Sequence, residues 1–462
     1  MPYNSFLNYP MSWKPDRARL ERPVYKSLAK ALEEDIANGL LAPGVKLPPQ
    51  RELADFLDIN FTTVTRAYRA CELKGLIYAV TGSGTFVSPS AAEPVTITSS
   101  RIKKETIDLG FVSSFESTNA LAAEAVKKLS SSSHIQDLLD YESPTGLPHQ
   151  KRAAVRWLSH VGYRAEEELL AIVPGTQDGL LLTLLALFEP GDRIAVDTFT
   201  YANFLELLRL LHLQPVPVRG DGEGMRPDAL EETWKLNPVK GVFLMPSCSN
   251  PTTVMMSSRR KEDLAAVISR RGIILIEDDI HAFFTEGLVE DYQGPLSSLV
   301  PDSHVYLSGT SKPLCSGLRV AYLGFSEKFR ARILEALFNV NVKTSSLDAE
   351  IITMMLTSGL AGRILEEKTE LARKANGLFS SIFPQSPAGH PLSFYRWLRI
   401  KTSRTGTETE EHLLNKGIRV YHSDRFLAGS RGEHCYLRLS LSTSQRLEEG
   451  LMILSGCLSE LK

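Results

Sequence analysis

The sequence predicts an α/β protein built from two parts, a small winged helix-turn-helix unit followed by a larger domain around a mostly parallel sheet. Two observations support this. Residues 23–87 follow the order helix, helix-turn-helix, hairpin, and from about residue 107 onward short apolar strands alternate with helical stretches. Such alternation is typical of a parallel sheet covered by helices. A chain of 462 residues is long enough for two or three domains.

Composition narrows the class of protein. The chain is 43% hydrophobic and 23% charged, with a formal net charge of −2, which excludes a polycation that binds nucleic acid along its whole length. The first residues contain no apolar signal segment, and no apolar run reaches the roughly 20 residues that span a bilayer. Five scattered cysteines (71, 248, 315, 435 and 457) form no CxxC pair. We therefore expect a cytoplasmic protein with reduced thiols, no metal site and no membrane partner.

The N-terminal unit is predicted from four consecutive segments. In the order helix, helix, helix and hairpin, they are 23–39, 51–59, 60–77 and 77–87. The first segment carries Leu and Ile at four-residue spacing, which is the pattern of an amphipathic helix. The last has two short β-branched and aromatic runs on either side of Gly82 and Gly84, which is typical of a hairpin.

Short polar side chains gather where this unit would contact DNA. The second helix of a helix-turn-helix lies in the major groove, and its first turns carry the donors. The DNA-contact candidates are Arg51, Asn60, Thr62, Thr63, Thr65 and Arg66, with Gly82 and Gly84 in the hairpin. Residues 1–90 hold eleven basic and nine acidic side chains, a weak charge signal. These residues could instead only cap and solvate a surface helix, but the ordered series of elements favours DNA binding.

Residues 88–106 are polar, contain Pro and Ser and lack periodicity, which is typical of a linker. We therefore divide the chain into a DNA-binding domain at 1–87, the linker at 88–106 and the α/β domain at 107–462. The last part, beginning between about 340 and 390, is expected to be a smaller α+β subdomain.

One lysine has unusual surroundings. Lys312 lies in SGTSKPLCSGLRVAY, among small residues just after a predicted strand at 304–309. A lysine in a dry pocket can lose its proton and attack a carbonyl, which is how pyridoxal 5′-phosphate (PLP) is held. A PLP site needs the lysine, a carboxylate for the pyridine nitrogen, a phosphate cradle, a partner for the phenolic oxygen and a stacking aromatic ring.

The sequence offers a candidate for each need, mostly near strand ends, where open α/β sheets bind ligands. Lys312 is the lysine and Asp278 the carboxylate for the pyridine nitrogen. The phosphate cradle is a helix start at Gly175, Thr176 and Gln177 with Arg319. Asn250 is the partner for the phenolic oxygen, and Tyr201 is the stacking ring. Each has an ordinary structural alternative; Asn250 with Pro251, for example, could be only a turn. Their joint occurrence favours a PLP site.

Two resemblances follow from these motifs. KLPPQRELA at 46–54 and GSGTFV at 82–87 resemble the GntR-type winged helix, although Phe61 stands where that family commonly has arginine. The larger domain resembles the fold type I aminotransferases in the order of its motifs. These are GTQ, TY, SNP, EDD, SK with an arginine seven residues later, and YLRLSL at 436–441. The combination is similar to the MocR family of bacterial transcription regulators.

The resemblance implies a fold type I aminotransferase-like domain, PLP as cofactor and a homodimer, which in this family is often head-to-tail. Tyr141 matches the tyrosine that reaches the partner's cofactor phosphate. Arg438 falls where the family binds an α-carboxylate, a planar target suited to a guanidinium group.

Two positions depart from the aminotransferase pattern. Ile280 replaces the usual tyrosine of EDDY, so either His281 contacts the phenolic oxygen or Asn250 acts alone. Gly309 replaces a common Ser or Thr. The candidates that could take over its phosphate bond are Thr310 and Ser311.

We therefore expect a regulator of transcription that binds double-stranded operator DNA and senses an amine or amino acid by aldimine exchange at Lys312, without physiological turnover. PLP itself could instead be the signal. Two other classes remain open: a working aminotransferase that also binds DNA, and a PLP-free structural dimeriser.

Overall fold

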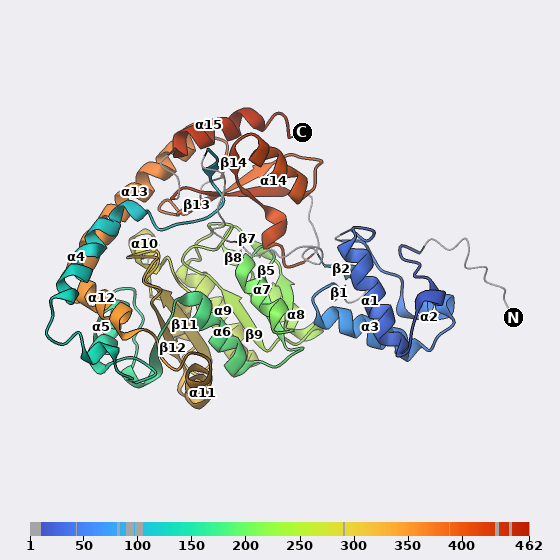
Figure 1. Cartoon of the computed structure of the whole chain (residues 1–462), viewed down its shortest axis with the longest axis horizontal. Helices are drawn as coiled ribbons and strands as arrows, with labels where there is room; N and C mark the ends of the chain where they lie inside the picture. The colour runs from blue at the N-terminus through green and yellow to red at the C-terminus, as the bar shows by residue number, and fades with distance from the viewer. Residues whose placement is uncertain are drawn as a thin grey trace.

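The computed structural model describes residues 11–42, 44–80, 84–88, 97, 105–141, 143–289, 292–387, 389–429, 434–442 and 446–461. A small N-terminal unit lies at one end of the molecule and a larger α/β body forms the rest, with the C-terminal elements along one side of it (Figure 1). Gly82 and most of the proposed linker at 88–106 fall outside the described residues. No helix in the described ranges is long and apolar enough to cross a membrane.

The N-terminal unit has the expected winged helix-turn-helix order. Its elements are α1 (Val24–Ala37), α2 (Gln50–Leu57), α3 (Phe61–Leu73), β1 (Ile77–Val80) and β2 (Gly84–Val87). The four-residue spacing in α1 buries Leu28, Leu32 and Ile36 against α2 and α3. Strands β1 and β2 pair in antiparallel fashion as the wing.

The body is organised around a seven-stranded sheet. The strand order is β4 (Leu170–Val173), β12 (Ala321–Phe325), β11 (His304–Gly309), β10 (Ile274–Asp278), β9 (Gly241–Leu244), β5 (Arg193–Asp197) and β6 (Gln214–Val218). Only β12 runs antiparallel to its neighbours, so the prediction of a mostly parallel sheet is confirmed.

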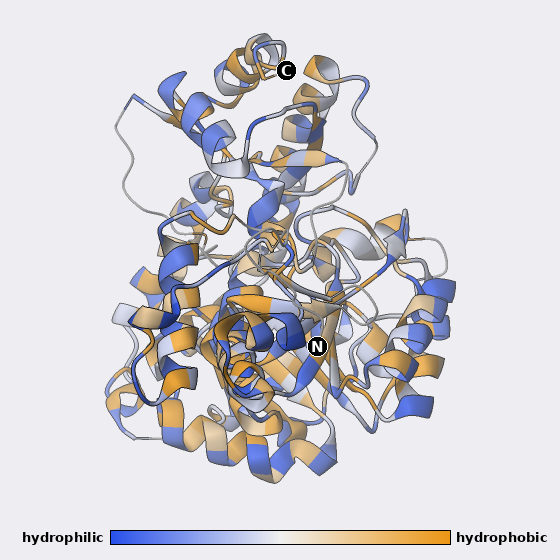
Figure 2. Cartoon of the chain, turned by 90° about the vertical axis from the view of Figure 1, so that its right-hand side faces the viewer, coloured by the Kyte–Doolittle hydropathy of each residue, from blue (hydrophilic) through white to orange (hydrophobic). Residues whose placement is uncertain are grey.

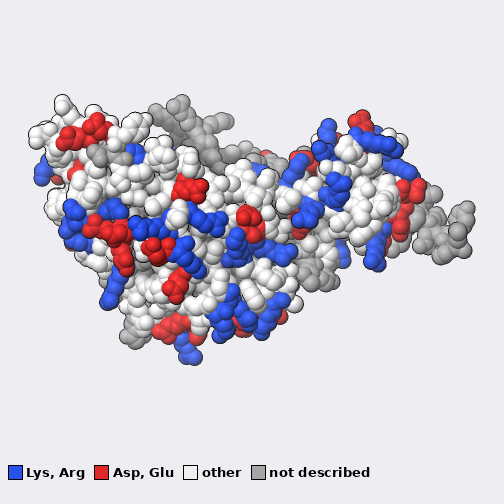
Figure 3. All heavy atoms as spheres, turned by 90° about the horizontal axis from the view of Figure 1, so that it is seen from below, with Lys and Arg blue, Asp and Glu red and all other residues white. Residues whose placement is uncertain are grey.

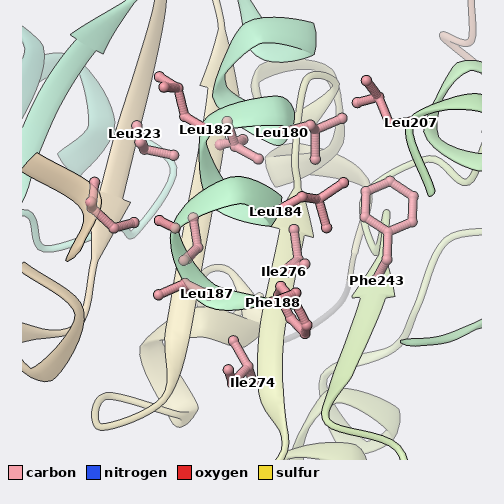
Figure 4. Packing of buried hydrophobic residues seen from close by; sticks show 14 of the residues in the cluster. Leu180, Leu182, Leu184, Leu187, Phe188, Leu207, Phe243, Ile274, Ile276 and Leu323 are labelled. Carbon is pink, nitrogen blue, oxygen red and sulfur yellow. The ribbon is translucent and has the colours of Figure 1, made fainter. Parts of the chain in front are cut away.

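Helices cover both faces because successive strand residues point to opposite sides. One face packs against α6 (Thr176–Leu187), α7 (Ala202–Leu210) and α11 (Arg330–Asn341), and Figure 4 shows leucines of α6 facing the sheet. The other face is covered by α5 (Pro148–Ser159), α8 (Pro227–Leu236), α9 (Ser258–Arg271) and α12 (Ser346–Thr357), and α4 (Asn119–Ser130) packs beside α12. Each fully buried leucine stabilises the fold by about 2 kcal/mol.

The C-terminal part forms a second, smaller sheet with its own core. Its elements are α13 (Leu360–Ile382), β13 (Tyr395–Ile400), α14 (Gly406–Asn415), β14 (Ile418–Arg419), β15 (Tyr421–His422), β16 (Cys435–Ser440) and α15 (Leu447–Cys457). In Figure 2 the helices near the C-terminus carry both hydrophobic and hydrophilic residues. The smaller elements of the body are β7 (Gly220–Asp221), β8 (Gly224–Met225) and α10 (Ala282–Thr285).

A segment from the start of the body also belongs to this second core. Strand β3 (Ile107–Asp108) pairs in parallel with β14, and Asp108 forms an ion pair with Arg419. Ile107 and Leu109 are buried among the C-terminal helices and strands. The subdomain therefore includes chain from both ends of the 107–462 region, whereas the sequence pattern indicated only its C-terminal share.

This topology places the loops that follow the parallel strands at one edge of the sheet. Strands β4, β5, β9, β10 and β11 are parallel to one another, so their carboxyl ends lie at the same edge of the sheet. The antiparallel β12 begins at that edge. All of the cofactor-site candidates from this domain's strand ends follow these strands or precede β12.

Candidate functional site

Lys312 lies three residues beyond the end of β11, in a turn. Its Nζ donates hydrogen bonds to the carbonyl oxygens of Val112 (2.7 Å) and Ser113 (3.1 Å). Burial, followed by the positive charges of Arg438, Lys368 and Arg319, lowers the pKa of Lys312 to about 7. A large fraction of the amine is therefore unprotonated near neutral pH, as a carbonyl-attacking lysine requires.

Asp278 ends the neighbouring strand β10 and is only 2% exposed. Among the described residues, its Oδ1 has no hydrogen-bond partner. Burial, and to a lesser degree Asp279, raises the pKa of Asp278 to about 8. A protonated ring nitrogen placed here would supply the missing partner and favour the carboxylate form. The residue thus fits the pyridine end of PLP.

The start of α6 fits the phosphate end. Gly175 precedes this helix with φ of +92°, and a Cβ at this position would lie 2.5 Å from Nη2 of Arg319. Glycine therefore allows the guanidinium group to lie close to the start of the helix, where the N–H groups of the first turn, including those of Thr176 and Gln177, have no partner within the helix. A helix N-terminus and an arginine together favour an anion such as phosphate.

The two departures from the aminotransferase pattern, Gly309 and Ile280, lie side by side. A Cβ at Gly309 would be 2.9 Å from Cγ2 of Thr176 and 3.3 Å from Cγ2 of Ile280. The hydroxyl of Thr310 donates to the carbonyl oxygen of Val320 at 2.7 Å, so it is committed to the backbone. Ser311 accepts from Nη1 of Arg319 at 3.5 Å and is therefore better placed beside the cradle.

Arg438 and Asn250 lie together on the other side of the site. Arg438 on β16 is buried, and its Nη1 donates to Oδ1 of Asn250 (3.4 Å) while its Nη2 donates to the Gly110 carbonyl (2.6 Å). Its Nε has no partner within the described part of the chain. Burial raises the pKa of Tyr201, directly before α7, to about 12, so its hydroxyl stays neutral.

His281 and Tyr141 have opposite surroundings. His281 is buried, and neither ring nitrogen is hydrogen bonded to any residue that the structure describes. Burial, His390 and Lys312 lower its pKa, so the ring is neutral and free to contact a polar ligand atom. Tyr141 is 90% exposed, and its ring is therefore not packed into the Lys312 site of its own chain.

Sequence reasoning missed one residue of the site, Lys368. It is fully buried in α13, and its Nζ donates to the carbonyl oxygens of Lys312 (2.9 Å) and Leu314 (2.6 Å). Burial lowers the pKa of Lys368 to about 7. Its position between Ile364 and Ala372, at four-residue spacing on the apolar side of α13, is the signal that could have revealed it.

In the DNA-binding unit, several predicted contacts also build the helix. Asn60 caps α3, its Oδ1 accepting from the backbone N and the Oγ1 of Thr62, both at 2.8 Å. Thr65 donates to Oε1 of Gln50 at 2.8 Å, which joins α3 to α2. These bonds orient the first turn of α3, where Thr63 is half-buried.

Among the described members of the set, the exposed ones are Arg51, Asn60, Thr62, Arg66 and Gly84. The Cζ of Arg66 lies 3.9 Å from the ring centroid of Tyr25, and that of Arg51 lies 5.8 Å from the Phe61 ring. Figure 3 shows Lys and Arg over the surface of this unit with acidic side chains among them.

The start of strand β2 in the wing packs closely against Lys46. Gly84 has φ of +117°, and a Cβ there would lie 2.8 Å from Cε of Lys46.

Comparison with known proteins agrees with both halves of the molecule. Residues 24–87 match the bacterial regulatory proteins of the gntR family, and residues 110–453 match the aminotransferases of class I and II. The chain is 34% identical, over the full length of both proteins, to the uncharacterized HTH-type transcriptional regulator YdeF of Bacillus subtilis.

Two further proteins are similar to large parts of the chain. The vitamin B6 salvage pathway transcriptional repressor PtsJ of Salmonella typhimurium is 26% identical over 66% of this chain and 68% of its own. The structure of LysN, an α-aminoadipate aminotransferase of Thermus thermophilus complexed with N-(5′-phosphopyridoxyl)-L-leucine, matches with a TM-score of 0.68. It is 22% identical, and the match covers 78% of this chain and 93% of LysN.

The fold and these matches define a DNA-binding transcription regulator that carries an aminotransferase-like domain. The chain belongs to the GntR-family transcription regulators that carry an aminotransferase class I and II domain, the arrangement of the MocR subfamily. The fold class predicted from the sequence is confirmed.

Proposed function

We propose that this protein binds PLP at Lys312, and that an amine or amino acid at this site controls its binding to operator DNA. The observation that carries the proposal is the pairing of β10 with β11. It brings to the same sheet edge Lys312 and the buried Asp278, whose Oδ1 has no hydrogen-bond partner among the described residues. The aminotransferase class I and II family is PLP-dependent, and the residues here fit that cofactor. When bound, PLP supplies a reactive aldehyde on an electron-withdrawing ring.

The chain's own residues have separate tasks in this proposal. Lys312 provides a neutral amine, because burial and nearby positive charges hold its pKa at about 7. Asp278 would accept a hydrogen bond from the protonated ring nitrogen. The first turn of α6 and Arg319 would hold the phosphate, and Tyr201 would supply the ring that stacks on the cofactor.

Arg438 gives the effector its expected chemistry. A buried guanidinium group with an unpartnered Nε, among the described residues, favours a carboxylate that completes its hydrogen bonds. Arg438 also makes the largest contribution of any charged side chain to the lowered pKa of Lys312, so the two cations are neighbours. An amino acid could therefore present its carboxylate to Arg438 and its amine near Lys312. The phosphopyridoxyl-leucine named in the LysN complex is a ligand of this class.

The active form proposed here is a cytoplasmic homodimer, with head-to-tail packing as the family resemblance implies. Helices α6 and α11, and the residue directly after α11, leave apolar side chains on the surface. The exposed members are Leu185, Phe338, Val340 and Val342. Lys343 donates to the carbonyl oxygen of Asp140, which places Tyr141 beside this surface. A partner chain docked here would cover these residues and receive Tyr141.

The test is DNA binding measured by fluorescence anisotropy on a labelled fragment of the protein's own promoter region, with PLP and a panel of amino acids. We expect at least one amino acid to change the affinity of the natural protein. Arg438→Ala should abolish that response while keeping the PLP absorption band. Arg399→Ala, an exposed arginine on the adjacent strand β13, is the matched control and should respond normally.

An undiminished response in Arg438→Ala would contradict the effector assignment. A response to PLP alone, with none to any amino acid, would make PLP itself the signal, as the name of PtsJ would suggest. Steady conversion of an amino acid to its keto acid would instead establish a working aminotransferase.

A further inference from the structure

The side chain of Asn203 holds the backbone of Ile97, a residue of the segment that joins the two domains. The N–H of Ile97 donates to Oδ1 of Asn203 at 2.8 Å, and Nδ2 of Asn203 donates back to the Ile97 carbonyl at 3.3 Å. A side-chain amide carries one acceptor and two donors, so this pair of bonds satisfies a peptide group much as a neighbouring strand would. Such a reciprocal pair fixes the position of one residue on the body surface.

The side chain of Ile97 packs into a small aromatic cluster. The buried members of the cluster are Ala202, Tyr421 and Phe426, and Phe199 and Trp397 lie at its edge with Ile97. Phe199 and Ala202 precede or begin α7 in the body, whereas the other three aromatic residues come from the C-terminal subdomain. The ring centroids of Phe199 and Trp397 are 5.3 Å apart. Ile97 therefore rests on the joint between the two parts of the body.

Asn203 is also connected to the phosphate cradle. Nε2 of Gln177, in the first turn of α6, donates to the backbone carbonyl oxygen of Asn203 at 3.4 Å. Tyr201, assigned above to the cofactor ring, is two residues away on the same turn of chain. A ligand that moves Gln177 or Tyr201 would shift the amide that holds Ile97.

The other half of the docking surface touches the effector arginine. The Cζ of Arg438 lies 4.9 Å from the ring centroid of Phe426 and 5.5 Å from that of Tyr421. A carboxylate that repositions Arg438 would therefore act on two rings that support Ile97. Ile97 is therefore connected to the phosphate cradle through Asn203 and to Arg438 through the aromatic cluster.

The far end of α7 contacts the DNA-binding unit. Nδ1 of His212, two residues beyond α7, lies 2.6 Å from the carbonyl oxygen of Leu73, the last residue of the recognition helix α3. A Cβ added to Gly75 would lie 3.0 Å from Cγ of Arg209. Helix α7 therefore spans from the Ile97 contact to the end of α3.

We propose that Asn203 and this aromatic cluster form a docking site for the interdomain segment at Ile97, and that ligand binding at the Lys312 site changes the strength of docking. The second clause rests on the proposed function, whereas the first does not. Docking fixes the segment that precedes the body, and its strength controls how freely the DNA-binding unit can reorient. A ligand can shift this equilibrium only by binding the docked and undocked states with different affinity.

Cysteine accessibility tests the docking in the full chain. Ile97→Cys is introduced together with Cys435→Ser, because Cys435 is the half-buried thiol and the other four cysteines are buried. The rate of reaction with a maleimide is then compared with and without Asn203→Ala. Two lost hydrogen bonds should raise the rate about tenfold. Asn339→Ala, which removes a bond confined to α11, is the control and should leave the rate unchanged.

Equal rates with Asn203 and with Asn203→Ala would overturn the docking site. The coupling is tested by adding PLP and then the amino acid that changes DNA affinity. We expect the maleimide rate to change at least about threefold in the Asn203 background and not in Asn203→Ala. An unchanged rate despite a visible PLP band would overturn the coupling alone. Absence of the band would instead refute the proposed cofactor site and the coupling with it, while the cofactor-free rate comparison still decides the docking.

Discussion

Replacing Lys368 with methionine is the perturbation that best separates electrostatics from packing in this site. The change keeps a long, unbranched side chain in the buried position but removes the ammonium group that donates to the carbonyl oxygens of Lys312 and Leu314. The buried charge itself opposes folding, and its loss offsets the loss of two charge-assisted bonds. We therefore expect the free energy of unfolding to change by less than about 2 kcal/mol.

The main effect falls on the pKa of Lys312, which Lys368 helps to lower to about 7. Removing the neighbouring charge should raise that pKa by about half a unit to one unit, and one unit corresponds to about 1.4 kcal/mol. The neutral fraction of the Lys312 amine at pH 7 would then fall from about one half to between a quarter and a tenth. Capture of PLP at pH 7 should become roughly two- to fivefold slower.

The assay is the rate at which the visible band appears after PLP is added, measured from pH 6 to 9. Because neutral amine is required, the rate rises with pH through the pKa of Lys312, and Lys368→Met should move that midpoint upward. Lys374→Met changes an exposed lysine of the same helix and should leave it in place. A midpoint unchanged in Lys368→Met, even with slower capture at every pH, would refute the electrostatic reasoning.

Three further outcomes are expected. Asp278→Asn should weaken PLP binding at least about tenfold. Without cofactor, Asp278→Asn should stabilise the protein by up to about 5 kcal/mol at pH 8 and by about 1.5 kcal/mol at pH 5, measured by urea unfolding. The reason is that the folded-state pKa of about 8 makes the buried carboxyl increasingly destabilising as pH rises from about 4 to 8. Equal effects at both pH values would contradict this. Gly175→Ala places a methyl group 2.5 Å from Nη2 of Arg319. Titration should therefore show about tenfold weaker binding of PLP and unchanged binding of pyridoxal, which has no phosphate. Equal losses for both ligands would contradict the assignment of this helix start as the phosphate cradle. Arg66→Ala should weaken operator binding and reduce the salt slope by about one, with the PLP spectrum unchanged; unchanged operator affinity would remove Arg66 from the interface.

The local sequence pattern was sufficient to predict a strand whose residues and flanking turns all lie close together in the sequence. The strand at 304–309 has the predicted bounds, because an apolar run flanked by turn residues is a complete local signal. Strand β6 was missed because Pro215 and Pro217 weaken a strand prediction. The fold tolerates them because β6 is an edge strand that pairs only with β5.

Other features depend on contacts between distant parts of the chain. Strand β4 is a four-residue apolar run after an acidic, helix-like stretch, and only its pairing with β12 defines it. The pairing of β3 with β14 joins segments more than three hundred residues apart. The candidate PLP residues could be selected from sequence because cofactor chemistry requires particular side chains after particular strands. Lys368 could not be placed beside Lys312 that way, because its role is to bond backbone carbonyls that any sequence would supply.

Whether Lys312 holds PLP is decided by the visible absorption spectrum of the purified protein with added PLP, recorded beside that of Lys312→Ala. We expect a band of lysine-linked PLP in the natural protein that reduction with borohydride makes permanent, and no such band in the variant. A band of equal strength in Lys312→Ala, or none in either protein, would contradict the assignment of Lys312 as the lysine that holds the cofactor.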